Sequence, residues 1–113
     1  MATAQFVHDG QSIDYTPGSD VAAGDVVVQG ALVGVTKLPI ASGVLGALAV
    51  TGVFDFPKTA GVSEAIAAGA KVYWDAGDGV AKTDDESGAN KYLGKVVTAA
   101  GDDDATVRVR LEQ

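Results

Sequence analysis

The sequence predicts an all-β fold: a small barrel or sandwich of short antiparallel strands with Gly-rich turns, and at most one short helix. Three observations predict it. Apolar and polar residues alternate with a period of two along several segments, which is the spacing of half-buried strands. The 15 Gly and only 3 Pro among 113 residues indicate many tight turns. Hydrophobic residues make up 47% of the chain but aromatics only 6%, and the abundant Val favours pleated, half-buried surfaces.

The expected strands lie between turn segments such as PGSD, DAGDG and DDESG. The clearest strand is ATVRVRLE at 105–112, which places Val107, Val109 and Leu111 on one face and Thr106, Arg108, Arg110 and Glu112 on the other. The remaining strand candidates are SIDYT at 12–16, DVVVQ at 25–29, ALAVTGVFDF at 47–56, KVYWD at 71–75 and KYLGKVVT at 91–98. Many short strands with Gly-rich turns indicate a barrel or sandwich rather than a parallel α/β sheet.

Only one segment is compatible with a helix, VSEAIAA at 62–68. Ser63 is a suitable N-cap and Gly69 a suitable stop, which allows one or two turns. Because no amphipathic helical period occurs elsewhere, a βαβ architecture is excluded.

One motif, an aliphatic residue or Thr followed by two small residues and Gly, occurs four times. The copies are VAAGDVVV at 21–28, IASGVLGA at 40–47, IAAGAKVY at 66–73 and TAAGDDDA at 98–105. Residues 21–37 also align with 66–82 over their full length. We interpret the unit as a small-residue turn, a Gly with positive φ, a strand, a second turn and a second strand. A phosphate-binding Gly loop is disfavoured, since such loops open a helix.

The composition excludes several classes of partner. Eight basic residues stand against 15 acidic ones, for a net charge of −7 and a pI near 4.3. Nucleic-acid binding needs a basic surface, so neither DNA or RNA nor an anionic membrane is an expected partner, whereas a basic protein is. The absence of Cys excludes disulfides and thiolate metal sites. The start MATAQFVHDG lacks the pattern of a secretory signal, and the weakly polar run at 43–54 is too short to span a bilayer.

Three segments invite a chemical interpretation, and none supports one. GANKYLGKV at 88–96 resembles a P-loop, but five residues separate its glycines where four are needed, and Val96 follows Lys95 where Ser or Thr is needed. His8 is the only histidine, has no G-x-S-x-G elbow to accompany it, and is expected to be exposed. The acidic residues at 75–86 and 102–104 lack EF-hand spacing and are expected to form solvated turns. We therefore predict no catalysis, no cofactor and no metal.

Contacts with other protein chains are the better expectation. Residues 1–10 form an expected N-terminal arm ahead of a single β-domain at 11–113. Gln5, Phe6 and Val7 are an extended stretch that could add as a strand to a partner's edge, with Phe6 giving specificity. Tyr73 and Trp74 face opposite sides of one strand, so one is expected in the core and the other at an interface, for which Trp74 is the candidate. Arg108 and Arg110 are further contact candidates on the polar face of the last strand.

Three stretches together carry a family resemblance: QFVHDGQSIDYTPGSDVAAGDVVVQGALVGV, AIAAGAKVYWDAGDGVAKT, and YLGKVV followed by the closing ATVRVRL. In this order they resemble the small capsid cement, or head decoration, proteins of tailed phages. The resemblance implies a structural virion protein that binds the major capsid protein lattice on the outside of the head. It also implies a homotrimer at three-fold or quasi-three-fold positions that clamps the expanded shell. Members are sometimes labelled as RecA-type recombinases, and the failed P-loop argues against that label for this chain.

A thin Ala and Val core in an edge-rich β-domain also favours a homotrimer independently of the resemblance, because association covers the edges.

The residues leave two other classes of function open. One alternative is a particle-displayed β-domain that binds carbohydrate or a receptor, which needs exposed aromatics over a groove. The other is a trimeric β-barrel hydrolase whose acidic and hydroxyl groups converge across a subunit interface.

Overall fold

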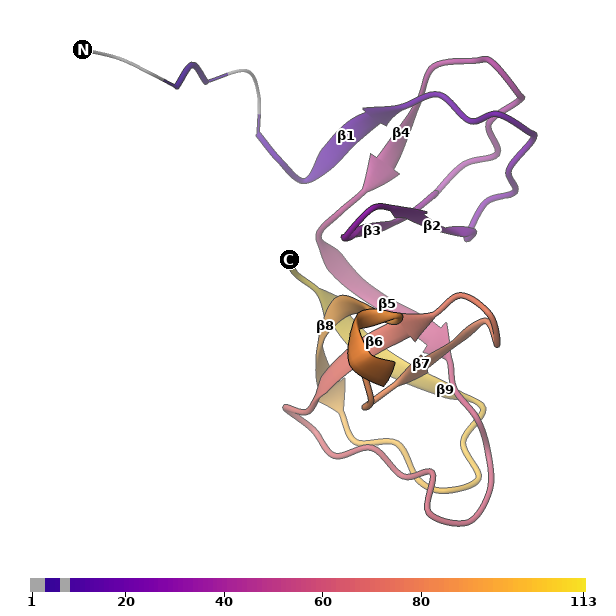
Figure 1. Ribbon diagram of the computed structural model, residues 1–113, viewed down its shortest axis with the longest axis vertical. Helices are drawn as coiled ribbons and strands as arrows, with labels where there is room; N and C mark the ends of the chain where they lie inside the picture. The colour runs from indigo at the N-terminus through magenta and orange to yellow at the C-terminus, as the bar shows by residue number, and fades with distance from the viewer. Residues whose placement is uncertain (1–3, 7–8) are drawn as a thin grey trace.

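The computed structural model describes residues 4–6 and 9–113 and confirms the all-β fold, with two antiparallel sheets (Figure 1). The first sheet has the strand order β1 (Ser12–Tyr15), β4 (Gly46–Ala49), β3 (Leu32–Val35) and β2 (Val26–Gln29). The second has the order β5 (Gly52–Pro57), β9 (Thr106–Leu111), β8 (Lys91–Thr98), β6 (Lys71–Asp75) and β7 (Val80–Lys82). Each sheet is therefore built from one continuous half of the chain.

Strand β9 has the alternation that its sequence predicts. Val107, Val109 and Leu111 are buried, and the residues between them are exposed. The strand lies between β5 and β8, with Phe54 opposite Val109 on one side and Val96 opposite Val109 on the other. An apolar stripe of period two thus runs through the middle of the sheet, where it forms the floor of the core.

The expected helix at 62–68 is wrong. Ile66 instead forms an isolated antiparallel bridge with Ala100, with N–O distances of 2.9 Å in both directions. The amide of Ala65 donates to the Asp102 carboxylate at 2.9 Å, and Ser63 has a left-handed φ of 64°. One or two helical turns are costly to nucleate, and here the chain around residue 100 takes up the backbone groups that a helix would use. Helical hydrogen bonding in the described residues is limited to a single 3-10 turn, η1 (Glu86–Gly88).

The repeated motif forms the turns that the sequence predicts, and its copies pair with one another. Gly24, Gly43 and Gly69 have φ values of 87°, 78° and 84°, a region that Gly enters without steric cost. Gly101 of the fourth copy does not have a positive φ, so this part of the prediction holds for three of the four copies. The copies beginning at Val21 and Ile40 bridge each other, and the copy beginning at Ile66 bridges the fourth copy at Ala100. The hairpins β2–β3 and β6–β7 follow the first and third copies, so the aligned unit of turn, strand, turn and strand is confirmed.

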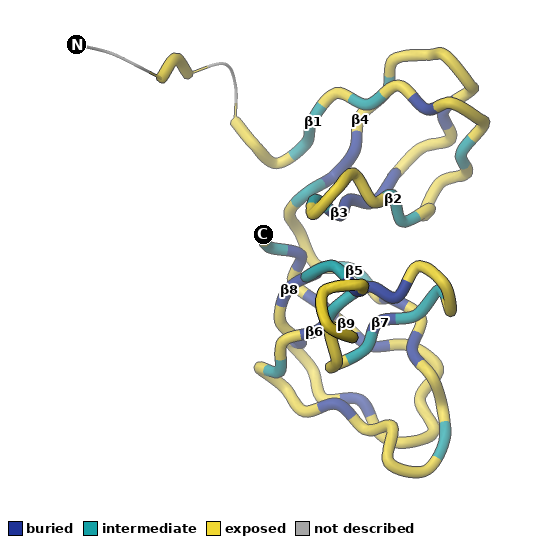
Figure 2. The backbone as a smooth tube through the Cα atoms, in the orientation of Figure 1, coloured by how far each residue is buried: buried dark blue, intermediate teal, exposed yellow. Residues whose placement is uncertain are grey.

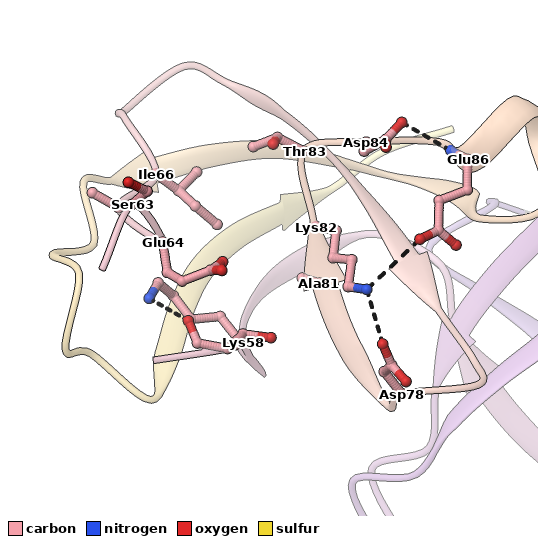
Figure 3. A pocket seen from close by; sticks show the side chains of 12 residues that line it. Lys58, Ser63, Glu64, Ile66, Asp78, Ala81, Lys82, Thr83, Asp84 and Glu86 are labelled. Carbon is pink, nitrogen blue, oxygen red and sulfur yellow. Dashed lines mark hydrogen bonds and ion pairs between the residues drawn. The ribbon is translucent and has the colours of Figure 1, made fainter. Parts of the chain in front are cut away.

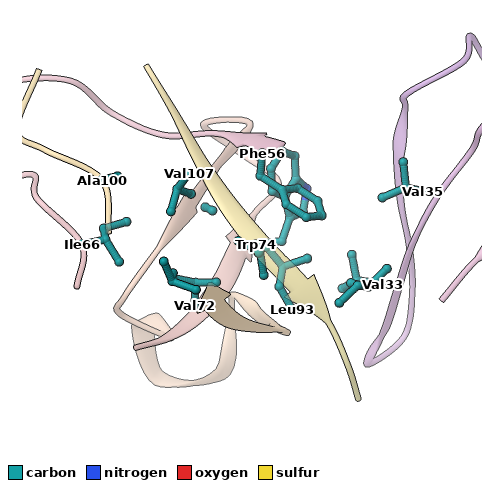
Figure 4. Packing of buried hydrophobic residues seen from close by; sticks show 13 residues of the cluster. Val33, Val35, Phe56, Ile66, Val72, Trp74, Leu93, Ala100 and Val107 are labelled. Atoms are coloured by element: carbon teal, nitrogen blue, oxygen red, sulfur yellow. The ribbon is translucent and has the colours of Figure 1, made fainter. Parts of the chain in front are cut away.

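The main core lies inside the second sheet, which curls until its edge strands β5 and β7 come into contact. Phe56 and Trp74 pack across it with ring centroids 5.9 Å apart (Figure 4). Val33 and Val35 of β3 extend the same cluster from the first sheet. Figure 2 shows buried positions in both sheets and exposed positions along the connecting loops. A barrel-like second sheet with the first sheet against it thus encloses a core in which Val is the commonest residue, with six of the 13 positions.

A side chain completes the junction between the two sheets. Gln113, which follows β9, accepts a hydrogen bond from the Val33 amide at 2.6 Å and donates one to the Val33 carbonyl at 2.8 Å. The Gln113 side-chain amide therefore makes the same pair of hydrogen bonds to β3 that a residue of a neighbouring strand would make. The division into an arm at 1–10 and a body at 11–113 remains a prediction, and no helix in the described part of the chain is long and apolar enough to cross a membrane.

Candidate interaction face

The outward face of the second sheet carries half of the basic residues of this acidic chain: Lys71, Lys95, Arg108 and Arg110. We call this surface the basic face. Lys71 lies opposite Lys95, and Lys95 lies opposite Arg110, so three cations form a row across β6, β8 and β9. Like charges placed directly opposite in a sheet are destabilising, so fold stability does not explain the row.

The four cations differ in how far carboxylates of the chain neutralise them. Arg108 lies opposite Asp55 and donates two hydrogen bonds to it, from Nε at 2.9 Å and from Nη2 at 3.2 Å. The hydrogen bond from Arg108 lowers the pKa of Asp55, so this pair stays charged. Lys95 and Arg110 share Glu112, each at 3.9 Å, and Lys71 has no ion pair among the described residues. The row of Lys71, Lys95 and Arg110 is therefore the part of the face most available to a partner.

Apolar and aromatic groups complete the basic face. Val53 lies opposite Arg110 and is exposed, and Val97 is exposed where the register of β8 and β9 shifts. Tyr73 and Tyr92 face each other with ring centroids 5.7 Å apart, and the Tyr92 hydroxyl lies 3.5 Å from Glu112. Burial, followed by the charge of Glu112, raises the pKa of Tyr92. Tyrosine and arginine are enriched in protein–protein interfaces, and on this face the tyrosines are half-buried.

The structure separates the contact residues predicted from the sequence. Arg108 and Arg110 lie outward on β9, as predicted, and belong to the basic face. Trp74 is only 8% exposed and packs on Phe56, so it is the core member of the Tyr73–Trp74 pair and Tyr73 faces outward. A contact through Trp74 stays a prediction, and the burial of its side chain leaves little surface for one.

The N-terminal candidates lie elsewhere. Gln5 and Phe6 are exposed. Their segment, residues 4–6, precedes β1 and lies away from the second sheet (Figure 1). Val7 lies outside the described residues, as does His8. Sequence reasoning missed Lys71, Lys95 and Val53. The period of two shows that each faces outward, but only the strand order β5-β9-β8-β6 brings them together.

A polar hollow of about 460 Å³ opens beside β7, at the edge of the second sheet (Figure 3). Its two lysines are fully engaged. Lys58 is buried, and its ammonium donates to the carbonyls of Thr59 at 2.8 Å and Asp104 at 2.9 Å. Lys82 pairs with Asp75 at 2.8 Å and Asp78 at 2.9 Å, which raises the pKa of Lys82 and lowers that of Asp75. These contacts of the two lysines hold loops together. We therefore attribute the charged groups of the hollow to the stability of the fold.

Taken with the fold, the basic face defines a protein of the structural or binding class. A family model described as phage cement protein matches residues 7–111, so the chain belongs to the phage cement protein family. The resemblance seen in the sequence is confirmed. Membership gives the chain a structural role in the phage capsid. No curated protein and no solved structure matched the chain in the corresponding comparisons.

Proposed function

We propose that the protein binds the outer surface of the major capsid protein lattice and stabilises the expanded phage head. The observation that carries the proposal is the basic face. This face has four cations, and two carboxylates pair with them. Its local charge is therefore +2, on a chain of net charge −7. A positive surface on an otherwise acidic molecule orients its approach to an acidic partner, and the acidic remainder repels the wrong orientation.

A cement protein gains from repetition. Contacts too weak to hold one copy add up when several copies in one assembly bind equivalent sites. We propose a homotrimer for this reason, and because the edge strands β1 and β2 of the first sheet leave backbone groups for a neighbour to cover. Stabilisation of the shell then comes from each trimer linking adjacent capsid subunits.

The alternative of a carbohydrate- or receptor-binding domain has less support. Such a site needs aromatic rings exposed over a groove. Among the described aromatic residues only Phe6 is exposed, and the tyrosines are half-buried. A glycan array with the purified protein tests this alternative, and specific retention of a sugar would favour it.

Co-sedimentation with expanded capsids that lack the protein tests the proposal. Lys95→Glu and Arg110→Glu should each weaken binding by about tenfold or more, because each places a negative charge in the basic row. Lys91→Glu is the matched control, since it makes the same charge change on the same strand β8 outside that row. Binding to intact, DNA-filled heads tests the outer location. Equal binding by all three variants would exclude the basic face as the capsid contact.

A further inference from the structure

The first sheet carries an apolar groove that the basic face does not involve. The groove has a volume of about 380 Å³, and its floor contains three small residues, Ser12 of β1 and Ala47 and Ala49 of β4. Its walls are aliphatic: Leu38, Val44 and Leu45 are 73%, 52% and 65% exposed. Three large aliphatic side chains gathered on one hollow differ from the isolated apolar residues of an ordinary surface and mark an interaction site.

The groove is held open by local structure. The turn at 41–44, with Gly43 at a φ of 78°, carries Val44 and Leu45 outward. Ile40 is buried and packs directly on Gly46, where any side chain would collide with it. The bridge between Val21 and Ile40 fixes this wall, with N–O distances of 2.9 and 3.0 Å. The groove is thus a preformed part of the fold, with a floor that small residues keep low.

The occupant is suggested by Phe6. This side chain is 80% exposed and is the only exposed aromatic ring among the described residues. A volume of about 380 Å³ is within the range of about 300–1,000 Å³ typical of small-ligand pockets, and so accommodates one ring with its flanking backbone. The chain therefore exposes both a large apolar side chain and an apolar groove without a large occupant.

The exposure of Phe6 favours a neighbouring copy over the same chain, because an 80% exposed ring does not fill the groove of its own chain. Residues 4–6 lie away from both sheets (Figure 1). Phe6 and Gln11 are five Cα–Cα steps apart, so Phe6 can lie up to about 17 Å from Gln11 when the chain is extended. Every copy holds one arm and one groove, so an exchange between copies covers both surfaces.

We propose that Phe6 of one copy inserts into the Leu38–Val44–Leu45 groove of a second copy. The contact is heterologous, because arm and groove are different surfaces, and repeating it gives a closed ring when the rotation between copies closes. The inference rests on the homotrimer of the proposed function, for which it supplies a subunit contact. It involves no part of the basic face and needs no capsid, so the two proposals can fail separately.

Single cysteines test the contact, because the chain has none of its own. A Gln5→Cys variant, which keeps Phe6, is mixed in the absence of capsids with a Lys37→Cys variant at the groove rim and treated with a short bismaleimide. A covalent pair of the two chains is expected. The control is a mixture of Gln5→Cys with Val62→Cys, which offers an 89% exposed position outside the groove. Cross-linking no greater than this control would overturn the proposal, and so would cross-linking within one chain of a Gln5→Cys/Lys37→Cys double variant.

Two further variants separate occupancy of the groove from simple proximity. Phe6→Ala removes the inserted ring, and Ala47→Leu fills the floor of the groove. Each should raise the dissociation constant of self-association by about 10- to 100-fold, as expected for the loss of one buried aromatic side chain. Val62→Ala is the control, and circular dichroism confirms that each variant is folded. Self-association of Phe6→Ala equal to that of Val62→Ala would overturn the proposal.

Discussion

Replacing Gln113 with Ala should loosen the junction between the two sheets. The Gln113 side chain makes two hydrogen bonds to Val33, at 2.6 and 2.8 Å, and Val33 itself is fully buried. The substitution removes both bonds and leaves a backbone N–H and a C=O of β3 without their partner. Since β3 also supplies Val33 and Val35 to the shared core, the effect extends to the packing between the sheets.

The size of the effect follows from the two bonds. Each intramolecular hydrogen bond contributes about 0.5–1.5 kcal/mol net, so the loss of both should lower the free energy of unfolding by about 1–3 kcal/mol. For a domain of this length, 1 kcal/mol shifts Tm by about 4 °C, so Gln113→Ala should melt about 4–12 °C below the unaltered protein. Gln113→Glu should recover only part of this loss, because a carboxylate accepts from the Val33 amide but cannot donate to its carbonyl.

Thermal unfolding monitored by circular dichroism measures the shift, and amide hydrogen exchange at Val33 locates it. The Val33 amide should lose protection in Gln113→Ala and keep part of it in Gln113→Glu. Gln29→Ala is the matched control, an exposed Gln on the edge strand β2. An unchanged Tm together with unchanged exchange at Val33 would refute the reasoning.

Three other predictions concern single positions. Gly94→Ala should lower the free energy of unfolding by about 1–3 kcal/mol in a denaturant titration, because a Cβ there would collide with the Arg110 carbonyl in the neighbouring strand; an unchanged midpoint would contradict this. Gly24→Ala should cost about 1 kcal/mol by the same measurement, since its φ of 87° disfavours a side chain, whereas Gly18→Ala should be nearly neutral. Arg108 holds the pKa of Asp55 below its usual value, so the stability this pair adds is present above about pH 4 and lost as the pH falls through the lowered pKa. Asp55→Asn should therefore show a weaker loss of Tm below pH 4, and a parallel loss in both proteins would count against the pair.

The parts of the fold that depend on short stretches of sequence were predictable. The alternation of β9 and the positive φ of Gly24 and Gly69 each follow from a few adjacent residues, and both are present in the structure. The helix at 62–68 failed for a non-local reason: Ile66 pairs with Ala100, 34 positions along the chain. Local preference could not anticipate that pairing.

The candidate sites depended more heavily on the register between distant strands. The sequence gives Arg110 an outward position, but its neighbours Lys95 and Val53 come from two other strands. The floor of the apolar groove likewise needs Ser12 opposite Ala49, a pairing that the hydrophobic periodicity does not predict. The family resemblance in the sequence predicted the class of protein, but it did not identify the residues of a contact surface.

The strand order of the second sheet has a consequence for synthesis. The first sheet is complete once residues 12–49 have been made, because all its strands are neighbours in that segment. The second cannot close until β9 is available, since β9 separates β5 from β8 and contributes Val107, Val109 and Leu111 to the core. A nascent chain stalled before residue 106 would therefore expose the apolar inner faces of β5, β6 and β8 to proteases and to aggregation. Because the second sheet closes last, the basic face can form only after β9 has been synthesised.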